Sequence, residues 1–276
     1  MTVFESFLLG LVQGVAEFLP ISSSGHLAIA QNLLHLEVND GILFDVLLHL
    51  GTLVAVVAAY WQDVVDMIRE FFAGARDLAK HKTPNPLPPA RRMILLIIVA
   101  TLPLFAVLPI KDKVEGLYNN MWFIGSALLV TGCLLRLSDR NCHGKKNEKN
   151  APYLDALAVG VAQAIATVPG ISRSGMTITA GCLVGFERRF AVRFAFLMSL
   201  PAVLGANILS IADAVQEGGL DWSLMPIYMV GVVTAAVSGY LCIRLLKMIA
   251  EKGKFGAFAY YCWFMGAVTL LLSAFR

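Results

Sequence analysis

The chain carries the stretch QGVAEFLPISSSGH at residues 13–26 and a second stretch, QAIATVPGISRSGM, at residues 163–176. The two align without a gap at an offset of 150 residues, and six of the 14 positions are identical. Three of the eight differences fall on polar positions, where Glu17, Ser23 and His26 are replaced by Thr167, Arg173 and Met176. A duplicated frame with divergent polar residues predicts two half-sites that supply different chemistry to one shared centre.

The composition indicates a membrane protein. Of the 276 residues, 58% are hydrophobic and 15% are charged, and the mean hydropathy is +0.71, which is more apolar than soluble domains are. A helix that crosses a bilayer needs ~20 mostly apolar residues. Six segments qualify, at roughly 42–62, 93–110, 119–137, 190–212, 225–247 and 255–275. We therefore predict an all-α, polytopic membrane protein with six transmembrane helices, the second of them kinked at Pro103.

Two further apolar regions, 3–36 and 154–186, are interrupted by proline, serine and glycine in the middle. Each half of these regions is too short to cross a bilayer alone. Non-helical backbone at membrane depth is tolerated only where it is buried in protein or lines a wet cavity. We expect each region to form a re-entrant helix hairpin, and a single kinked spanning helix in each place is the alternative.

These elements predict an inverted-topology repeat. We interpret 1–137 as the first repeat, 138–150 as a basic cytoplasmic linker and 151–276 as the second repeat of one membrane domain, 1–276. Each repeat holds one hairpin and three crossings, and because three is odd the second repeat enters the membrane inverted. Inverted repeats whose broken helices meet near the midplane are common in transporters.

The loop charges predict the same topology. With the N-terminus outside, the cytoplasmic loops and helix ends hold 18 of the 22 Lys and Arg residues, at 63–92, 136–152, 187–193 and 244–254. Only Lys111, Lys113 and Arg276 fall outside, and Arg173 lies in the second hairpin. Cytoplasmic loops carry the excess of basic residues, so we predict that both termini lie outside. The proline-rich residues 74–92 are interpreted as a cytoplasmic linker.

The first hairpin carries several candidate site residues. Gln13 and Glu17 are four residues apart and share one face of a helix. A carboxylate at membrane depth is costly and needs a cation or a cavity, and the alternative is a Glu paired for packing. Ser22–Ser24 open the next helix, where free N–H groups suit a phosphate and where serines also act as N-caps. His26 lies three residues after Ser23 and shares its face.

The second hairpin supplies a cation. Arg173 lies where this hairpin breaks, and a guanidinium is the usual partner for multidentate phosphate contact. The alternative is that Arg173 only neutralises Glu17. Neighbouring glycines that let the backbone approach an anion, and hydroxyls that add hydrogen bonds, are Gly170, Gly175, Ser172, Ser174 and Thr177. A carboxylate, an imidazole, hydroxyls and a guanidinium together favour phosphoryl chemistry.

Two further features carry less information. Asp45 and His49 are four residues apart, which fits support of the site, a divalent ion or a helix-packing contact equally. Five cysteines are scattered without a C-x-x-C pair, and most lie in or beside apolar segments. There a thiol behaves as a small hydrophobe, so we expect neither a disulfide framework nor a zinc site.

The motifs of both hairpins resemble those of the undecaprenyl-diphosphatase family of bacterial membrane proteins, also called the bacitracin-resistance family. The likeness is carried by Gln13-x-x-x-Glu17, by the run from Pro20 to His26 and by Pro169 to Thr177, and hairpin placement and repeat order match along essentially the whole chain. The resemblance implies hydrolysis of undecaprenyl diphosphate to undecaprenyl phosphate and phosphate, which recycles the lipid carrier for cell-wall synthesis and gives bacitracin tolerance. It implies an outward-facing site in the bacterial plasma (inner) membrane, helped by Mg²⁺ or Ca²⁺.

The resemblance also assigns roles to residues. It implies four catalytic residues, Glu17, Ser23, His26 and Arg173. From the hairpin residues themselves we predict a substrate-binding set of Gln13, Ser22, Ser24, Gly170, Ser172, Ser174, Gly175 and Thr177. Glu17 and Gln13 are then the metal ligands, but Gln13 departs from members that have Glu there, which puts a metal site built on two acids in doubt.

Some alternatives stay open at this point. The attacking group is Ser23, a metal-activated water or His26. A transporter or flippase for polyprenyl phosphate lipids is the alternative function, because inverted repeats are transporter architecture. We expect undecaprenyl diphosphate and membrane lipid as partners and no nucleic acid, and the sequence leaves a homodimer open.

Overall fold

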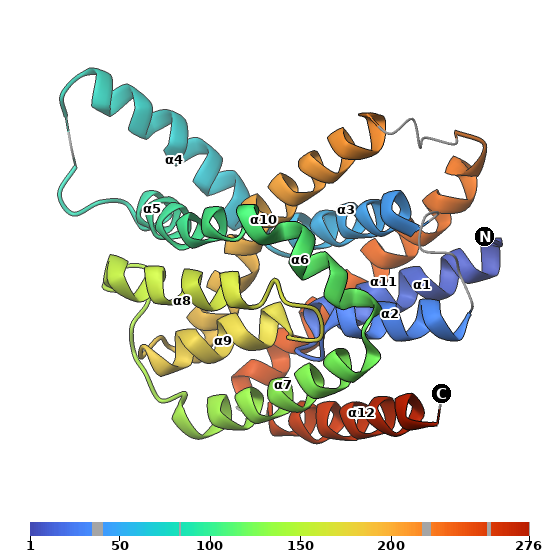
Figure 1. The fold of residues 1–276 in the computed structure, drawn as a ribbon. Coiled ribbons are helices and arrows are strands. Elements are labelled where there is room, and N and C mark those ends of the chain that lie inside the picture. Colours follow the sequence, from blue (N-terminus) through green and yellow to red (C-terminus); the bar gives the residue numbers. More distant parts are fainter. Residues whose placement is uncertain (35–40, 83, 217–221, 253–254, 276) are drawn as a thin grey trace.

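In the computed structural model, which describes residues 1–34, 41–82, 84–216, 222–252 and 255–275, the chain folds into helices (Figure 1). The α-helices are α1 (Val3–Phe18), α2 (Ser23–Leu33), α3 (Gly41–Ala59), α4 (Trp61–Ala79), α5 (Pro89–Thr101), α6 (Lys111–Glu115), α7 (Met121–Asn141), α8 (Tyr153–Ile165), α9 (Arg173–Leu183), α10 (Arg188–Gln216), α11 (Met225–Lys252) and α12 (Gly256–Ala274). Short 3₁₀ turns are η2 (Leu102–Ala106), η3 (Leu108–Ile110), η4 (Gly116–Asn119) and η5 (Trp222–Leu224). Within the described ranges the only β-pairing is an isolated bridge between Lys146 and Phe186. The all-α prediction is confirmed.

Five helical segments of the described chain are long and apolar enough to cross a membrane. They are Pro89–Ile110, Met121–Asn141, Arg188–Ala212, Met225–Glu251 and Gly256–Ala274. A sixth is counted if α3 and α4, which meet at 85°, form one broken span. The five match five of the six predicted segments, and α3 covers the sixth, 42–62, so the polytopic fold is confirmed. The predicted kink is also present, because α5 ends at Thr101 and continues as 3₁₀ turns around Pro103, where the ring removes a helical hydrogen bond.

The two duplicated stretches each break a helix. The first break separates α1 from α2 between Phe18 and Ser23, and the second separates α8 from α9 between Ile165 and Arg173. The four helices have 16, 11, 13 and 11 residues, fewer than the ~20 that a crossing needs. That each pair enters and leaves by one face stays a prediction, and residues 35–36 of the first hairpin lie outside the described residues.

Elements of the two predicted repeats pack against each other. Helix α1 lies along α11, and α7 lies along α12. The α1–α11 contact is close because Gly10 faces Gly231 and Gly14 faces Ala235 and Ser238, so that a Cβ on either α1 glycine would overlap the neighbouring backbone or side chain. Small residues are the usual device by which membrane helices approach one another. This packing holds the broken helices of one repeat against long helices of the other.

Two expectations from the sequence are wrong. The linker placed at 74–92 begins later, because α4 continues to Ala79; its apolar residues recur with helical spacing, but its charges keep its hydropathy low. A disulfide joins Cys142 to Cys182. Cys142 follows α7 and Cys182 lies in α9, two helices that pack together. A separation of 40 residues gives no sign of that contact in the sequence.

Candidate active site

The first hairpin presents a carboxylate at its break. Glu17 lies in the last turn of α1, and its side chain is only 10% exposed. Gln13, one turn earlier and fully buried, donates from Nε2 to Glu17 Oε2 at 3.2 Å. Helix α1 ends directly after Glu17, ahead of Pro20, so the carboxylate lies at the mouth of the break.

The serines that follow are divided among three tasks. Ser22 has a positive φ of 74° and caps α2 by accepting a hydrogen bond from Gly25 N at 3.2 Å. Ser23 donates from Oγ to Glu17 Oε2 at 2.5 Å. Ser24 Oγ accepts a hydrogen bond from Gly170 N at 3.3 Å and so links the two breaks. Only Ser23 joins the carboxylate directly.

The second hairpin repeats the cap of the first. Ser172 caps α9 by accepting a hydrogen bond from Gly175 N at 3.1 Å, the counterpart of the Ser22–Gly25 contact. The preceding turn has a positive φ of 86° at Gly170, which favours glycine. Thr131 of α7 holds this turn, since its hydroxyl donates to Gly170 O and accepts from Ser172 N, both at 3.1 Å. Thr131 gave no signal in the sequence.

Arg173 brings the two half-sites together. Its Nη1 lies 3.5 Å from Glu17 Oε1, across a sequence separation of 156 residues. The duplicated frame therefore converges on one centre, as the alignment predicts. Other predicted residues of this hairpin make hydrogen bonds within it. Ser172 Oγ and Ser174 Oγ lie 3.2 Å apart, and Thr177 Oγ1 donates to Arg173 O at 2.8 Å.

The two histidines take different positions. The contacts of the His26 ring within the described residues are with Ser22 and Tyr261: its Nδ1 lies 2.8 Å from Ser22 O, its Nε2 lies 2.9 Å from Tyr261 Oη, and its ring stacks on Tyr261. His49 of α3 instead places Nε2 3.9 Å from Glu17 Oε2. His49 Nδ1 lies 2.7 Å from Asp45 O; because a carbonyl only accepts, that nitrogen carries the proton. The Asp45–His49 spacing was the sequence signal for this residue.

A cavity of about 590 Å³ opens onto this centre. Its polar lining includes Glu17, Ser23, Ser24, His49, Lys111, Tyr118, Gln163, Thr167, Ser172 and Arg173. Its apolar lining comes mainly from the chain after α5 and from α10, including Leu104, Phe105, Leu108, Pro201, Ile208 and Leu209. Predicted site residues outside the lining are Gln13, Ser22, His26, Gly170, Ser174, Gly175 and Thr177.

Gln163 is a residue that the sequence analysis passed over. It is the counterpart of Gln13 in the second repeat, it is only 1% exposed, and it lines the cavity. Neither its Oε1 nor its Nε2 has a hydrogen-bond partner within the described residues. Buried polar groups are normally paired, so this amide is suited to a ligand. The offset of 150 residues was the signal that pointed to it.

The residues around Glu17 fit a divalent cation only in part. The described chain holds no cluster of three or more His, Cys, Asp or Glu side chains suited to a metal. Gln13 Oε1, however, is buried and has no hydrogen-bond partner among the described residues, because Nε2 is the atom that faces the carboxylate. One carboxylate and one amide oxygen are hard ligands of the kind that Mg²⁺ and Ca²⁺ take, and Mg²⁺ commonly completes its shell with water and substrate phosphate. The donor set fits a cation shared with a phosphate ligand.

Broken helices that converge on a carboxylate, a guanidinium and hydroxyls, among long apolar helices, define a polytopic membrane protein with a polar intramembrane site. A family model described as "Bacitracin resistance protein BacA" matches residues 6–268. The chain belongs to this family.

Curated relatives span the whole chain. Proteins named undecaprenyl-diphosphatase from Methanosphaera stadtmanae, Alkaliphilus metalliredigens and Halothermothrix orenii are 39%, 42% and 41% identical to it over 279, 275 and 274 residues. Each match covers 99% of this chain and 99% of the relative. The resemblance expected from the two motifs is confirmed.

Proposed function

We propose that the protein hydrolyses undecaprenyl diphosphate to undecaprenyl phosphate and inorganic phosphate, and so recycles the lipid carrier of cell-wall synthesis and confers bacitracin tolerance. The names of its relatives support this reaction. The observation that carries it is a single cavity whose wall contains Glu17, Ser23 and Arg173 at one place and apolar side chains at another. An anionic diphosphate on a long hydrocarbon chain has the same two parts.

The apolar wall suits the prenyl chain. Leu108 and Ile208, which line the cavity, are 49% and 59% exposed on the protein surface. In a bilayer that surface meets acyl chains, so a prenyl tail can pass from the cavity into the lipid without leaving apolar surroundings. The diphosphate then lies at the helix breaks, where Arg173 and the first N–H groups of α2 and α9 face it. Helix N-termini and guanidinium groups both favour phosphate.

Ser23 is the proposed nucleophile. Its hydroxyl already donates to Glu17, so Glu17 can accept the proton as Ser23 Oγ attacks the terminal phosphorus. The bond to the bridging oxygen breaks, and undecaprenyl phosphate leaves. Water then hydrolyses the phosphoserine to give phosphate and restores Ser23. In the alternative, Glu17 takes the proton from a water that attacks directly, and the overall reaction is the same.

Arg173 neutralises charge that builds up on the phosphoryl oxygens. In phosphoryl transfer the protein contributes chiefly by positioning and by stabilising that charge. The 3.5 Å contact with Glu17 keeps the guanidinium at the cavity wall before substrate arrives. The ion pair and the clamp are therefore compatible roles.

The remaining polar residues position these three. His49 lies beside Glu17 Oε2, the oxygen that Ser23 and Gln13 also contact. Gln163 offers to the diphosphate an amide that has no hydrogen-bond partner within the described residues. His26 is proposed to orient Ser23 through its contact with the Ser22 carbonyl rather than to touch substrate. A bound Mg²⁺ or Ca²⁺ would be held by Glu17 and Gln13 Oε1 and would neutralise diphosphate charge.

The site is proposed to open toward the outside of the bacterial plasma membrane, with both termini on that side. Lys111 and Tyr118, in the segment that the loop charges place outside, line the cavity. The start of α1 and the end of α12 lie at the same end of the helix bundle (Figure 1), which supports one location for both termini.

The test is phosphate release by purified protein in detergent micelles. Glu17→Gln, Ser23→Ala and Arg173→Ala are each expected to lose most turnover while remaining folded. Arg189→Ala serves as the matched control, since Arg189 is 69% exposed and pairs only with Glu251 among the described ion pairs. Full activity in all three site variants would refute the assignment. Lipid translocation in vesicles without phosphate release would support a transporter instead.

A further inference from the structure

Helix α4 has neither a buried nor a membrane-spanning character. It leaves the end of α3 at 85° and none of its 19 residues is buried. Six of those residues carry a charge, namely Asp63, Asp66, Arg69, Glu70, Arg76 and Asp77. Charges at the centre of a bilayer are costly, so α4 does not cross the hydrocarbon core. Figure 1 shows it extending away from the body of the helix bundle.

One side of α4 is apolar and uncovered. Trp61, Ile68, Phe71, Phe72 and Leu78 are between 53% and 77% exposed. At 3.6 residues per turn these positions fall on one side of the helix. An uncovered stripe of this kind marks a site of interaction with protein or membrane.

The acidic side of α4 is tied to the protein. Asp63 pairs with Arg193 of α10 at 2.5 Å, and Glu70 and Asp77 both pair with Arg91 of α5 at 3.0 Å. These three carboxylates are spaced seven residues apart and lie along one line of the helix. The ion pairs fix the rotation of α4. Phe71 and Leu78 of its apolar side line a groove together with Arg91, and Trp61, Ile68 and Phe72 are exposed outside that groove.

The basic residues remain at the surface. Arg69 is 74% exposed, and Arg76, Lys80 and Lys82 are also exposed. Three of the four α4 carboxylates face arginines of other helices, and the fourth, Asp66, lies 3.9 Å from Arg69. Arg76, Lys80 and Lys82 therefore leave the outer rim beside the apolar side positive. A helix with an apolar face and a basic polar face is typical of the membrane interface, where it meets anionic headgroups.

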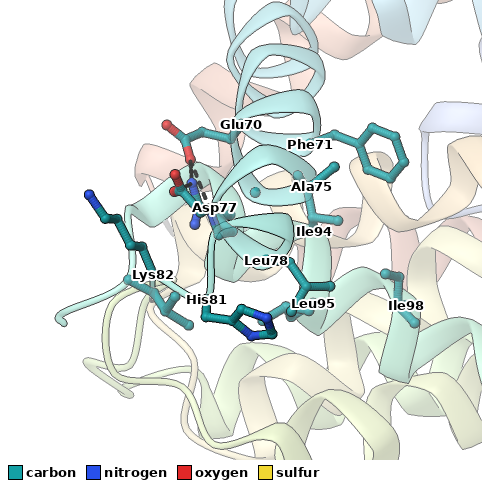
Figure 2. A pocket seen from close by; sticks show the side chains of 13 residues that line it. Glu70, Phe71, Ala75, Asp77, Leu78, His81, Lys82, Ile94, Leu95 and Ile98 are labelled. Atoms are coloured by element: carbon teal, nitrogen blue, oxygen red, sulfur yellow. Dashed lines mark hydrogen bonds and ion pairs between the residues drawn. The ribbon is translucent and has the colours of Figure 1, made fainter. Parts of the chain in front are cut away.

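A groove of about 630 Å³ lies between α4 and α5. That size falls in the ~300–1,000 Å³ range of pockets that hold small molecules. Figure 2 shows the apolar residues Phe71, Ile94, Leu95 and Ile98 toward one side of the groove and Lys82 toward the other, where Glu70 and Asp77 also lie. Both carboxylates pair with Arg91, which lines the groove as well, so the groove joins an apolar trough to a polar end at which Lys82 is exposed.

We propose that α4 lies in the membrane interface and that the α4–α5 groove binds an anionic phospholipid. One acyl chain packs against Phe71, Leu95 and Ile98, and the headgroup phosphate meets Lys82, with the exposed Lys80 two residues earlier on the adjacent rim. This occupant matches both halves of the groove, whereas a neutral lipid would leave the lysines without a counter-charge. The proposal is independent of the reaction at Glu17.

The test is native mass spectrometry of the full chain in detergent, titrated with phosphatidylglycerol or with phosphatidylcholine of the same acyl chains. Wild type is expected to retain phosphatidylglycerol preferentially. The double variant Lys80→Gln, Lys82→Gln is expected to weaken phosphatidylglycerol binding by about fivefold for each lysine removed, and to leave phosphatidylcholine binding unchanged. Leu95→Trp, which fills the apolar trough, is expected to weaken retention of both lipids with the lysines intact.

The matched control is the double variant Lys145→Gln, Lys149→Gln, which removes two exposed lysines elsewhere. An equal loss in this control, no preference in the wild type, or full binding by Leu95→Trp would each overturn the proposal. A second copy of the chain on the same face would also overturn it. That outcome would appear as a dimer that Phe72→Ser converts to monomer.

Discussion

Ser23 and Glu17 share a hydrogen bond of 2.5 Å across the break of the first hairpin, although Ser23 begins one helix and Glu17 ends the other. The other oxygen of the carboxylate faces Arg173. One acid therefore contacts a hydroxyl of its own hairpin and a cation of the opposite hairpin. The two oxygens of the Glu17 carboxylate therefore have different partners, and the expected effects of changes at Ser23, His49 and Gln13 depend on this arrangement.

If Ser23 and Glu17 act as nucleophile and base, the losses of kcat in the two single variants should not add up in the double variant. Glu17→Gln is expected to lower kcat by ~10²–10⁴-fold, the usual contribution of a positioned base. Ser23→Ala should cost a similar amount, and the double variant should be little worse than either, because residues that act as a unit lose their effect together. Steady-state kinetics on all three variants measures this, with Glu187→Gln, an exposed acid, as control. Multiplicative losses would show independent roles.

His49 is expected to act through Glu17 rather than on substrate. His49→Leu removes the polar neighbour 3.9 Å from the carboxylate and should lower kcat by roughly tenfold, about 1.4 kcal/mol. His49→Gln keeps a polar group at similar reach and should recover most of that loss with an unchanged pH profile. If His49 itself transfers a proton, the Gln variant will be as poor as Leu and the pH profile will lose one limb.

Replacing Gln163 with an apolar residue should raise the stability of the protein and lower its affinity for the diphosphate substrate. The buried Gln163 amide has no hydrogen-bond partner in the part of the chain that the structure describes, and an unpaired buried polar group costs ~1–3 kcal/mol. Gln163→Met, which is similar in volume and apolar, should therefore raise the thermal midpoint in detergent. It should also raise KM, because the amide no longer meets the diphosphate, with kcat little changed. A lower midpoint would mean that the amide is paired in the folded protein.

The α1–α11 contact predicts a stability effect that depends on position. Gly10→Ala would place a Cβ against the backbone of Gly231, and overpacking of this kind typically costs ~1–3 kcal/mol. Gly205→Ala is the matched change, since no atom lies within 4 Å of the added Cβ in α10. It should be neutral or stabilising by up to ~1 kcal/mol, because alanine favours helix. Thermal denaturation of the two variants separates close packing from a general intolerance of alanine.

The sequence predicted the parts of this protein that depend on local pattern. Apolar segments, the helix breaks at Pro20 and Pro169-Gly170, and the pairing of Glu17 with Arg173 followed from hydropathy and from the repeat. Contacts between distant helices were not predictable, because nothing in the spacing of Thr131, Tyr261 or Cys182 shows which helix lies beside them. His26 illustrates the limit: it shares a helix face with Ser23, yet its ring turns toward α12 and Tyr261.

The departure at Gln13 gives a prediction about metal dependence. In this chain Gln13 donates to Glu17 through Nε2 and leaves Oε1 unpaired, so a cation gains one carboxylate and one neutral oxygen. Gln13→Glu replaces the donor with a second carboxylate next to Glu17. Two buried like charges repel unless a cation lies between them, so the variant should bind Mg²⁺ or Ca²⁺ more tightly and depend on it more strongly.

For Gln13→Glu we expect a lower thermal midpoint than wild type in EDTA and a larger stabilisation on adding the ion. The ion concentration that gives half-maximal activity should also be lower. Gln13→Met, which lacks both the donor and the acceptor, should show none of these effects. Equal metal titrations for wild type and Gln13→Glu would place the cation away from Glu17.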